Sequence, residues 1–263
     1  MSRHWCLRWI PASNFFIVPV VLAATVVIQT TVPTRAQPFI LWQTETIPRT
    51  CTEIIPVSLE AAGRDRLFWK NKTELRVRFI NGSQALREQV RTYASVWNQY
   101  SGLPFVFVEG GVSEIRVSFL PDGTTWSYIG NAAQNVAQDV PTMNFGWFDE
   151  HTTGPVEFRR VILHEFGHAL GLIHEHQSPA AAINWNKIAV YQYYFDHFGW
   201  SHNKVNENIF KKYATALTQF TTYDPTSIMH YPIPPEFTND NSHVDWNSSL
   251  SAQDKQFVRH IYP

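Results

Sequence analysis

The chain has 263 residues, of which 44% are hydrophobic and 16% are charged, and its formal net charge at pH 7 is −1. This is the composition of a folded protein that can bury one sizeable core or two lobes facing across a cleft, and it does not indicate disorder. A net charge this small provides neither the basic field that binds nucleic acid nor a polybasic stripe for an anionic membrane, so we expect neither partner.

Residues 1–36 have the features of a secretory signal peptide. Basic residues precede an apolar run over 15–28, and Thr34-Arg35-Ala36 resembles a small-residue cleavage site. The run is about 14 residues long, shorter than the roughly 20 that span a bilayer, although an uncleaved anchor is the alternative. We therefore expect a secreted protein whose exported chain begins near Gln37.

The segment 37–66 contains three prolines and has no sustained helical or alternating period. This predicts a pro-segment or an extended N-terminal arm in front of a domain over 67–263. Arg64-Asp65-Arg66 provides a basic site at which a protease could release that domain. Cys6 lies in the signal, so Cys51 is the only thiol of the exported chain and no intramolecular disulfide can form.

The next part of the chain predicts a sheet with helices packed on it. Residues 75–80 alternate apolar and basic side chains and end at Asn81-Gly82, as a half-buried strand followed by a turn does. A stripe of apolar residues predicts a helix that starts near Ser83 and stops at 102–104; its members are Leu86, Val90, Tyr93, Trp97 and Tyr100. Two further strands are predicted over 105–108 and 115–119.

Two segments, 126–130 and 142–147, also have strand character. If the second lies at the edge of the sheet beside the active site, its unpaired backbone groups could bind an extended peptide as an added strand. The alternative is a core strand that makes no such contact.

The segment 155–177 contains the pattern H-E-x-x-H-x-x-G-x-x-H, formed by His164, Glu165, His168, Gly171 and His174. On a helix, residues four apart share a face, so the first two histidines can bind one ion with Glu165 beside its open position. Gly171 tolerates the left-handed conformation that ends a helix, and the returning chain would bring His174 to the same ion.

Three neutral imidazoles and an open fourth position favour a catalytic zinc ion, because structural zinc sites are usually closed by four ligands rich in cysteine. Zinc lowers the pKa of a bound water from 15.7 to about 7. Glu165 can accept that proton and later pass it to a leaving amine. The motif thus predicts the hydrolysis of peptide bonds.

Beyond the motif, helices are predicted over 187–198 and 206–216, and a turn over 223–225 precedes Ser227-Ile228-Met229-His230-Tyr231-Pro232. A last helix begins at Ser251, with Asp254 as its capping partner.

Together these residues resemble the metzincin metalloproteases, whose long zinc motif is paired with a later Met-turn, here at Met229. Within that clan the chain looks like an astacin, on the strength of HEFGHALGLIHEHQ from His164, WSYIG from Trp126, SIMHY from Ser227 and LSAQDKQFVRHIY near the end. The resemblance covers roughly residues 67–263.

The resemblance implies an α+β, two-lobed zinc protease domain, with a mixed twisted sheet and helices above the cleft and a mostly helical lower lobe. It implies that His164, His168 and His174 bind Zn²⁺ and that Glu165 is the general base and acid. Met229 would form a hydrophobic floor under the histidines. Tyr231 would be a removable fifth ligand that can hydrogen-bond the oxyanion of the transition state.

The chain departs from the astacin pattern in two respects. Thr125 stands where a disulfide cysteine is common in the family. Members also often keep themselves latent through a pro-segment aspartate that binds the zinc. The motif around that aspartate is not found here, and Asp65 is a candidate for the role. Cys51 is a second candidate for latency, because its thiolate could fill the open zinc position until the arm is removed; an unpaired cysteine without a role is the alternative.

The function that follows is a secreted, monomeric zinc endopeptidase acting on protein or peptide substrates. One alternative is a metzincin of another family, such as a matrixin or a serralysin. The other is a secreted binding protein with a zinc-stabilised fold and no chemistry, although such a protein has no reason to keep Glu165.

Overall fold

The computed structural model describes residues 51–54, 67–70, 72–214 and 222–263. The expected signal peptide, the basic site at 64–66 and Asp65 lie outside these ranges. The chain divides into two compact units, and all the described residues belong to the second, which spans Thr46–Pro263. Among them, no helix has the length and apolar character needed to cross a membrane.

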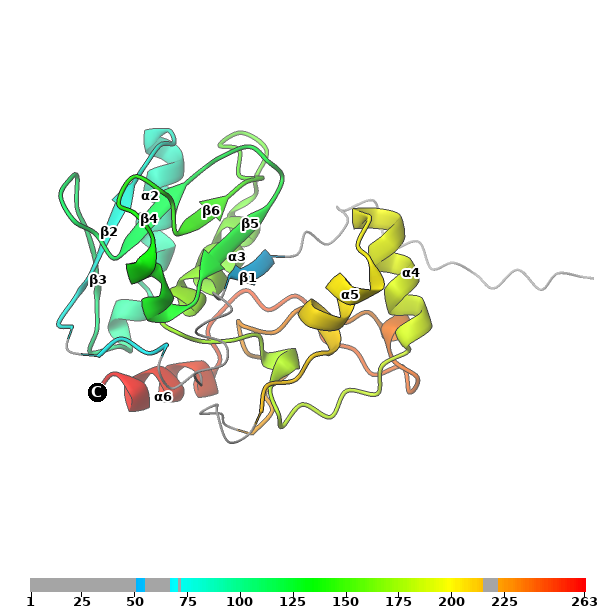
Figure 1. The fold of residues 1–263 in the computed structure, drawn as a ribbon. Helices are drawn as coiled ribbons and strands as arrows, with labels where there is room; N and C mark the ends of the chain where they lie inside the picture. The colour runs from blue at the N-terminus through cyan, green and yellow to red at the C-terminus, as the bar shows by residue number, and fades with distance from the viewer. Residues whose placement is uncertain (1–50, 55–66, 71, 215–221) are drawn as a thin grey trace, which may run out of the picture. The chain divides into compact units, whose positions relative to one another are not determined.

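A six-stranded mixed sheet forms one side of this unit (Figure 1). Its strands, in the spatial order of the sheet, are β1 (Cys51–Ile54), β5 (Thr125–Tyr128), β6 (Met143–Phe145), β4 (Ile115–Ser118), β2 (Leu75–Phe79) and β3 (Phe105–Phe107). Neighbouring strands are parallel except for β5 and β6, so β1 and β5 run against the other four.

The strands predicted between 75 and 147 are confirmed, but the strand expected at the edge of the sheet lies inside it. The segment at 142–147 forms β6, which is fully buried between β5 and β4, so the prediction that it is the edge strand beside the active site is wrong. That position belongs to β5, which pairs on its outer side with β1. Short apolar runs identify a strand but do not show which neighbours it pairs with.

Two helices pack on the sheet. Helix α2 (Gln84–Ala94) begins at Ser83, whose hydroxyl accepts from Leu86 N, and a 3-10 turn, η2 (Trp97–Gln99), continues the apolar stripe after α2 has ended. Helix α3 (Pro155–Ala169) has proline at its first position, where the missing N–H costs nothing. A further 3-10 turn, η3 (Gly130–Asn135), follows β5.

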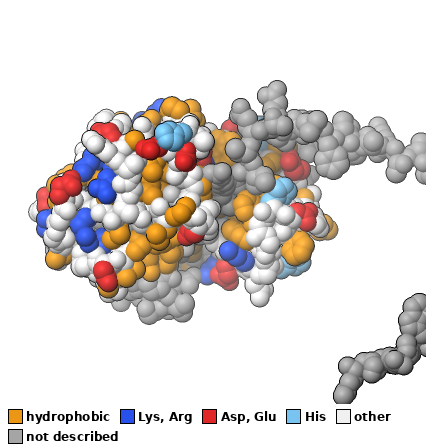
Figure 2. Space-filling view, turned by 90° about the horizontal axis from the view of Figure 1, so that it is seen from above, with side chains coloured by type: hydrophobic (Ala, Val, Ile, Leu, Met, Phe, Trp, Pro, Cys, Tyr) orange, Lys and Arg blue, Asp and Glu red, His pale blue; other side chains and the backbone are white. Residues whose placement is uncertain are grey.

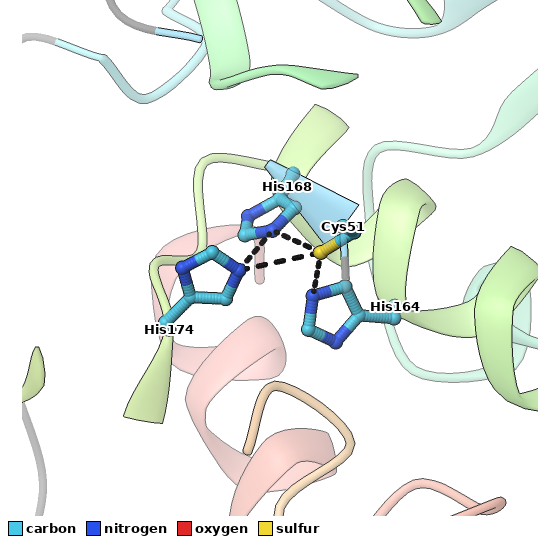
Figure 3. Close-up of side chains that lie close together, drawn as sticks. All are labelled: Cys51, His164, His168 and His174. Carbon is cyan, nitrogen blue, oxygen red and sulfur yellow. Dashed lines mark hydrogen bonds between the residues drawn. The ribbon is translucent and has the colours of Figure 1, made fainter. Parts of the chain in front are cut away.

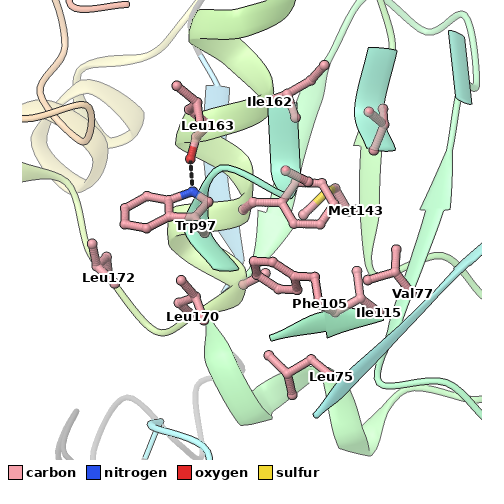
Figure 4. Packing of buried hydrophobic residues seen from close by; sticks show 14 of the residues in the cluster. Leu75, Val77, Trp97, Phe105, Ile115, Met143, Ile162, Leu163, Leu170 and Leu172 are labelled. Atoms are coloured by element: carbon pink, nitrogen blue, oxygen red, sulfur yellow. Dashed lines mark hydrogen bonds between the residues drawn. The ribbon is translucent and has the colours of Figure 1, made fainter. Parts of the chain in front are cut away.

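The main core lies between the sheet and these helices (Figure 4). Trp97 is fully buried there, and its indole N–H donates to Leu163 O at 3.0 Å, which ties the η2 turn to the middle of α3. Phe105 meets Phe166 edge-on at 4.8 Å. Helix α3 is therefore fixed on the face opposite its histidines by the packing of large side chains.

The remainder of the chain forms a second, smaller core around aromatic side chains. Its elements are η4 (Glu175–Gln177), α4 (Lys187–Phe198), α5 (His202–Val205), the π-helical turn η5 (Asn206–Phe210) and η7 (Pro235–Phe237). The helix predicted over 206–216 is confirmed only in its first part, since η5 is helical over Asn206–Phe210, residues 211–214 are not helical, and 215–216 lie outside the described residues.

The last helix, α6 (Ala252–Ile261), has the predicted cap. The Ser251 hydroxyl accepts from Asp254 N, and the Asp254 carboxylate accepts from Ser251 N. Val258 and Tyr262 bury the helix against the main core. On the face shown in Figure 2, basic and acidic side chains are interspersed, as the near-zero net charge leads one to expect.

Candidate active site

Helix α3 presents His164 and His168 on one face, one turn apart, with their ring centroids 4.7 Å from each other. Both side chains are buried. Because α3 is held by the core along its opposite face, the two imidazoles have fixed positions.

Gly171 ends the helix in the way the sequence predicts. Its φ is +101°, in the left-handed region that favours glycine, and a Cβ here would lie 2.8 Å from the Phe68 ring. The last carbonyls of the helix are also satisfied, because Trp69 Nε1 donates to Ala169 O and the Tyr262 hydroxyl donates to Leu170 O, both at 2.7 Å. The returning chain then places His174 beside the helix.

The three imidazoles converge on one point, and Cys51 of β1 lies at that point (Figure 3). The Cys51 Sγ atom is 2.8 Å from His164 Nε2, 3.4 Å from His174 Nε2 and 3.9 Å from His168 Nε2. The Nε2 atoms of His168 and His174 are 3.1 Å apart. These four atoms form a compact, fully buried group with the composition of a metal site.

The other nitrogen of each imidazole has a hydrogen-bond acceptor, which the motif alone did not reveal. His164 Nδ1 is 2.8 Å from Ile228 O, and His168 Nδ1 is 2.9 Å from Leu172 O. His174 Nδ1 is 3.3 Å from Gln177 Oε1. Donation from Nδ1 selects the tautomer in which Nε2 keeps its lone pair, and all three lone pairs therefore face the shared point.

The electrostatics favour neutral imidazoles. Burial, followed by the charge of His168, lowers the pKa of both His164 and His174 well below the ordinary range. Neutral imidazole is the form that binds a metal ion. Three such nitrogens with one thiol suit zinc in tetrahedral coordination, so the residues present fit the ion implied by the motif.

Glu165 lies next to His164 on α3 and is completely buried. Within the described residues, its carboxylate oxygens have no N–H or O–H donor, and the Cys51 thiol is a weak donor beside them. Burial raises the pKa of this carboxyl well above its usual range, against the opposing influence of Cys51 and Arg160. A buried carboxylate without N–H or O–H donors is costly, and such groups are found where they exchange protons.

Met229 and Tyr231 both lie close to residues of the zinc motif. Met229 is buried against Gly167, which has no room for a Cβ because of the Met229 sulfur. The Tyr231 ring lies 4.3 Å from that of His174 and is stacked on His176 at 4.6 Å. Its hydroxyl donates to the backbone carbonyl of Cys51. Burial raises the pKa of Tyr231 well above 10, so this group is a hydrogen-bond donor.

A small pocket adjoins the histidine group, and His164, Glu165 and Tyr231 form part of its lining. Trp147 and Trp246 supply aromatic walls. Cys51 of β1 also lines this pocket, so in this structure the arm closes it from one side.

Strand β1 covers the site, although the sequence predicted no regular structure in the arm. Its backbone pairs in parallel with β5, from Cys51 opposite Thr125 to Ile54 opposite Tyr128. Glu53, two residues after Cys51, accepts a hydrogen bond from the Tyr213 hydroxyl, and its Oε2 is 3.5 Å from His174 Nδ1. Alternation along a strand explains why both side chains point into the site.

The chain matches a family model described as Astacin (Peptidase family M12A) over residues 64–256. Two curated relatives match over shorter stretches. The zinc metalloproteinase nas-38 of Caenorhabditis elegans is 29% identical over 150 residues, and human matrix metalloproteinase-19 is 31% identical over 146 residues. These stretches are 55% and 49% of this chain, and they span only 17% and 27% of the relatives' own lengths.

Two solved structures align with this chain over nearly the whole of their own length. Two structures of myroilysin are 42% and 40% identical, with TM-scores of 0.74 and 0.61. They cover 76% and 82% of this chain, and 98% and 91% of theirs.

High choriolytic enzyme 1, a hatching enzyme zinc-protease from the medaka Oryzias latipes, is 17% identical with a TM-score of 0.52, over 75% of this chain and 95% of its own. At that identity it supports the fold alone. The α+β metzincin-type fold of this domain agrees with the family model and the solved structures, and its zinc metalloprotease class rests on the family model and the curated relatives. The chain belongs to the astacin family of peptidases, family M12A.

Proposed function

We propose that the protein is a secreted zinc endopeptidase, made as a latent precursor. The observation that carries this proposal is the convergence of three Nε2 atoms on one point, beside the completely buried carboxylate of Glu165. In this proposal His164, His168 and His174 hold the zinc ion, and Glu165 is the general base and acid.

Zinc, when bound, supplies a Lewis acid that polarises the scissile carbonyl and acidifies water. Glu165 accepts the proton of the attacking water and transfers it to the leaving amine. Its raised pKa suits both steps, because a carboxyl group that is too acidic returns a proton poorly. The Tyr231 hydroxyl donates a hydrogen bond to the oxyanion, a contact worth about 3 kcal/mol for a well-placed donor.

The substrate is an extended peptide that pairs with β5. Strand β1 now occupies this edge, and the Tyr231 hydroxyl donates to its backbone, as it would to a substrate carbonyl. Backbone pairing accepts peptides of varied sequence, while side-chain pockets provide preference. Trp147 and Trp246 give the adjoining pocket a flat aromatic lining that suits a large side chain.

Latency comes from the arm, with Cys51 as the residue that blocks the site. Burial and then the charge of Glu165 raise the pKa of this thiol, so without a cation it would stay protonated. A coordinated metal ion reverses this preference and deprotonates a thiol outright. Glu53, held by Tyr213, adds a second point at which the arm is attached. Cleavage within 64–66, outside the described residues, would release the arm.

Secretion rests on residues 1–36, which also lie outside the described part. N-terminal sequencing tests both expected cleavages. We expect the latent exported form to begin near Gln37 and the active form near Leu67. An active secreted protein that still begins at Gln37 would contradict release at 64–66.

The activity is tested with a generic protein substrate such as casein. The processed enzyme should lose activity in a zinc chelator and recover it when zinc is restored, and Glu165→Ala should lose activity by about 10²–10⁴-fold while keeping its zinc. Activity that survives the chelator or the substitution would overturn the proposal. A zinc-stabilised binding protein would show no activity in any form.

Latency is tested on the unprocessed chain, with Cys51→Ser as the variant and Thr52→Ala as the matched control on the same strand. We expect the serine variant to be active without cleavage and the control to stay latent. If Cys51→Ser is as latent as the parent chain, the thiol does not block the site.

A further inference from the structure

The carboxylate of Asp254 connects the last helix to the zinc motif. Asp254 lies in the first turn of α6 and is 5% exposed. A capping residue of this kind needs only its contacts with Ser251. Here the same carboxylate also accepts from the Ser227 hydroxyl at 2.7 Å and from Ile228 N at 2.9 Å. It therefore holds the Met-turn as well as the start of its own helix.

The Met-turn in turn holds a zinc-motif histidine. Ile228 N donates to Asp254, and Ile228 O lies 2.8 Å from His164 Nδ1. Both polar groups of one buried backbone residue are thus engaged, one by the helix and one by the imidazole. The Ser227 hydroxyl also accepts from Met229 N at 3.1 Å, which tightens the same turn. Two hydrogen bonds to Asp254 and one within the turn consequently fix the place of the acceptor for His164.

We propose that Asp254 is a positioning residue for the metal site, which fixes the Met-turn backbone so that Ile228 O holds His164 in its ligand orientation. This inference rests on the proposed role of His164 as a ligand. Partners beyond the ligands commonly set the orientation and basicity of a metal-bound imidazole. Asp254 acts on His164 indirectly, because the backbone of Ile228 lies between them. It belongs to a helix and stands 90 residues after His164 in the chain.

The burial of Asp254 supports a role beyond capping. Helices α2, α4 and α5 are capped by Ser83, Asn186 and Ser201, and none of these helices has an acidic residue in its first turn. In α6 the cap alone could be made by Ser251. Burial raises the pKa of Asp254, against the hydrogen bonds from Ile228 and Ser227, so keeping a carboxyl group here has an energetic cost.

The test compares Asp254→Asn with Ser251→Ala in the full chain loaded with zinc. In the asparagine variant Nδ2 replaces one of the two acceptor oxygens, so either Ile228 N loses its acceptor or the contact with Ser227 must reverse, with Nδ2 donating to the hydroxyl. We expect its zinc affinity, measured by competition with a chelator, to fall about 10–100-fold. In the processed form, kcat should fall by a similar factor while KM changes less than about twofold, because the change affects the metal and not the substrate contacts.

Ser251→Ala is the matched control, since it removes the hydroxyl that caps α6 and bonds Asp224, but it removes no hydrogen bond made by Ser227 or Ile228. It should lower stability by about 0.5–2 kcal/mol and leave zinc affinity unchanged. If Asp254→Asn fails to fold, Ser227→Ala removes a single contact with the same carboxylate and should give a smaller loss of zinc affinity. Unchanged zinc affinity in both variants, or an equal loss in Ser251→Ala, would overturn the inference.

His164→Ala separates this inference from the proposed function. If that variant loses zinc while Asp254→Asn keeps it, only the positioning role fails. If His164→Ala binds zinc as tightly as the parent chain, the ligand assignment itself fails.

Discussion

The sheet half of the molecule, residues 67–169, and the lower half, residues 174–250, are held together in different ways. The sheet half packs large side chains into one continuous core around Trp97 and α3. The described residues of the lower half form two isolated bridges and a smaller aromatic cluster, and Cys51 of the arm belongs to that cluster. The comparison indicates that the sheet half supplies rigid support for the zinc motif, whereas the lower half is completed by the arm.

The largest expected effect tests this difference directly. Trp97→Ala should lower the free energy of unfolding by about 3–5 kcal/mol, because it leaves a large cavity and removes the hydrogen bond to Leu163 O. Trp200→Ala in the lower half should cost clearly less, because Trp200 stacks on Tyr194 at the border of a smaller cluster. Chemical denaturation of both variants measures the two values. Equal losses would remove the distinction between the halves.

The second prediction concerns Tyr231, which lies in the lower half beside the histidines of the zinc motif. Tyr231→Phe keeps the ring that stacks on His176 but removes the hydroxyl, so the fold should be unchanged. In the processed enzyme we expect kcat to fall about 10²–10³-fold with little change in KM, as for the loss of one oxyanion donor. Steady-state kinetics provides the measurement. A variant with unaltered kcat would show that the hydroxyl serves only the contact with the arm.

The smallest effect concerns acid stability in the sheet half. Burial raises the pKa of Glu114, but hydrogen bonds from Lys72 and from Arg76 N outweigh this, and the net pKa is lowered from 4.5. A lowered pKa contributes stability above pH 4.5 that is lost as the pH falls through the folded value.

Glu114→Gln should therefore lower the free energy of unfolding by less than about 1 kcal/mol at pH 7. Below pH 4.5 the variant should lose less stability than the parent chain does. Urea unfolding at a series of pH values tests this. The control Glu109→Gln removes an exposed ion pair with Arg91 and should have little effect at any pH. If the free energies of unfolding of the parent chain and of Glu114→Gln changed in parallel with pH, Glu114 would not be the source of the acid sensitivity.

The sequence predicted the sheet half better than the lower half, for a physical reason. Leu86, Val90 and the alternating residues of 75–79 bury one face each, and such a face leaves a period in the sequence. The lower half is built from aromatic pairs and hydrogen bonds of irregular segments, which leave no period. The helix predicted over 206–216 stops at Phe210, and η5 is held by contacts such as that of Gln177 Nε2 with Glu207 O, which the sequence pattern does not show.

The site shows the same division. The positions of His164, His168 and His174 follow from fixed spacing on a helix and its glycine turn, so they could be predicted. Their acceptors, such as Ile228 O and Leu172 O, are backbone groups that carry no signature in the side chains. Asp254 could be recognised as a cap but not as a partner of the Met-turn, because that contact joins segments distant in sequence.

The most direct test of the account is X-ray absorption spectroscopy of the zinc-loaded, unprocessed chain. It should show one sulfur at about 2.3 Å and three nitrogens at about 2.0–2.1 Å from zinc, and the sulfur should disappear when the arm is removed. Zinc bound only by nitrogen and oxygen in the unprocessed chain would contradict the role of Cys51. A first shell with fewer than three imidazole nitrogens would contradict the metal site itself.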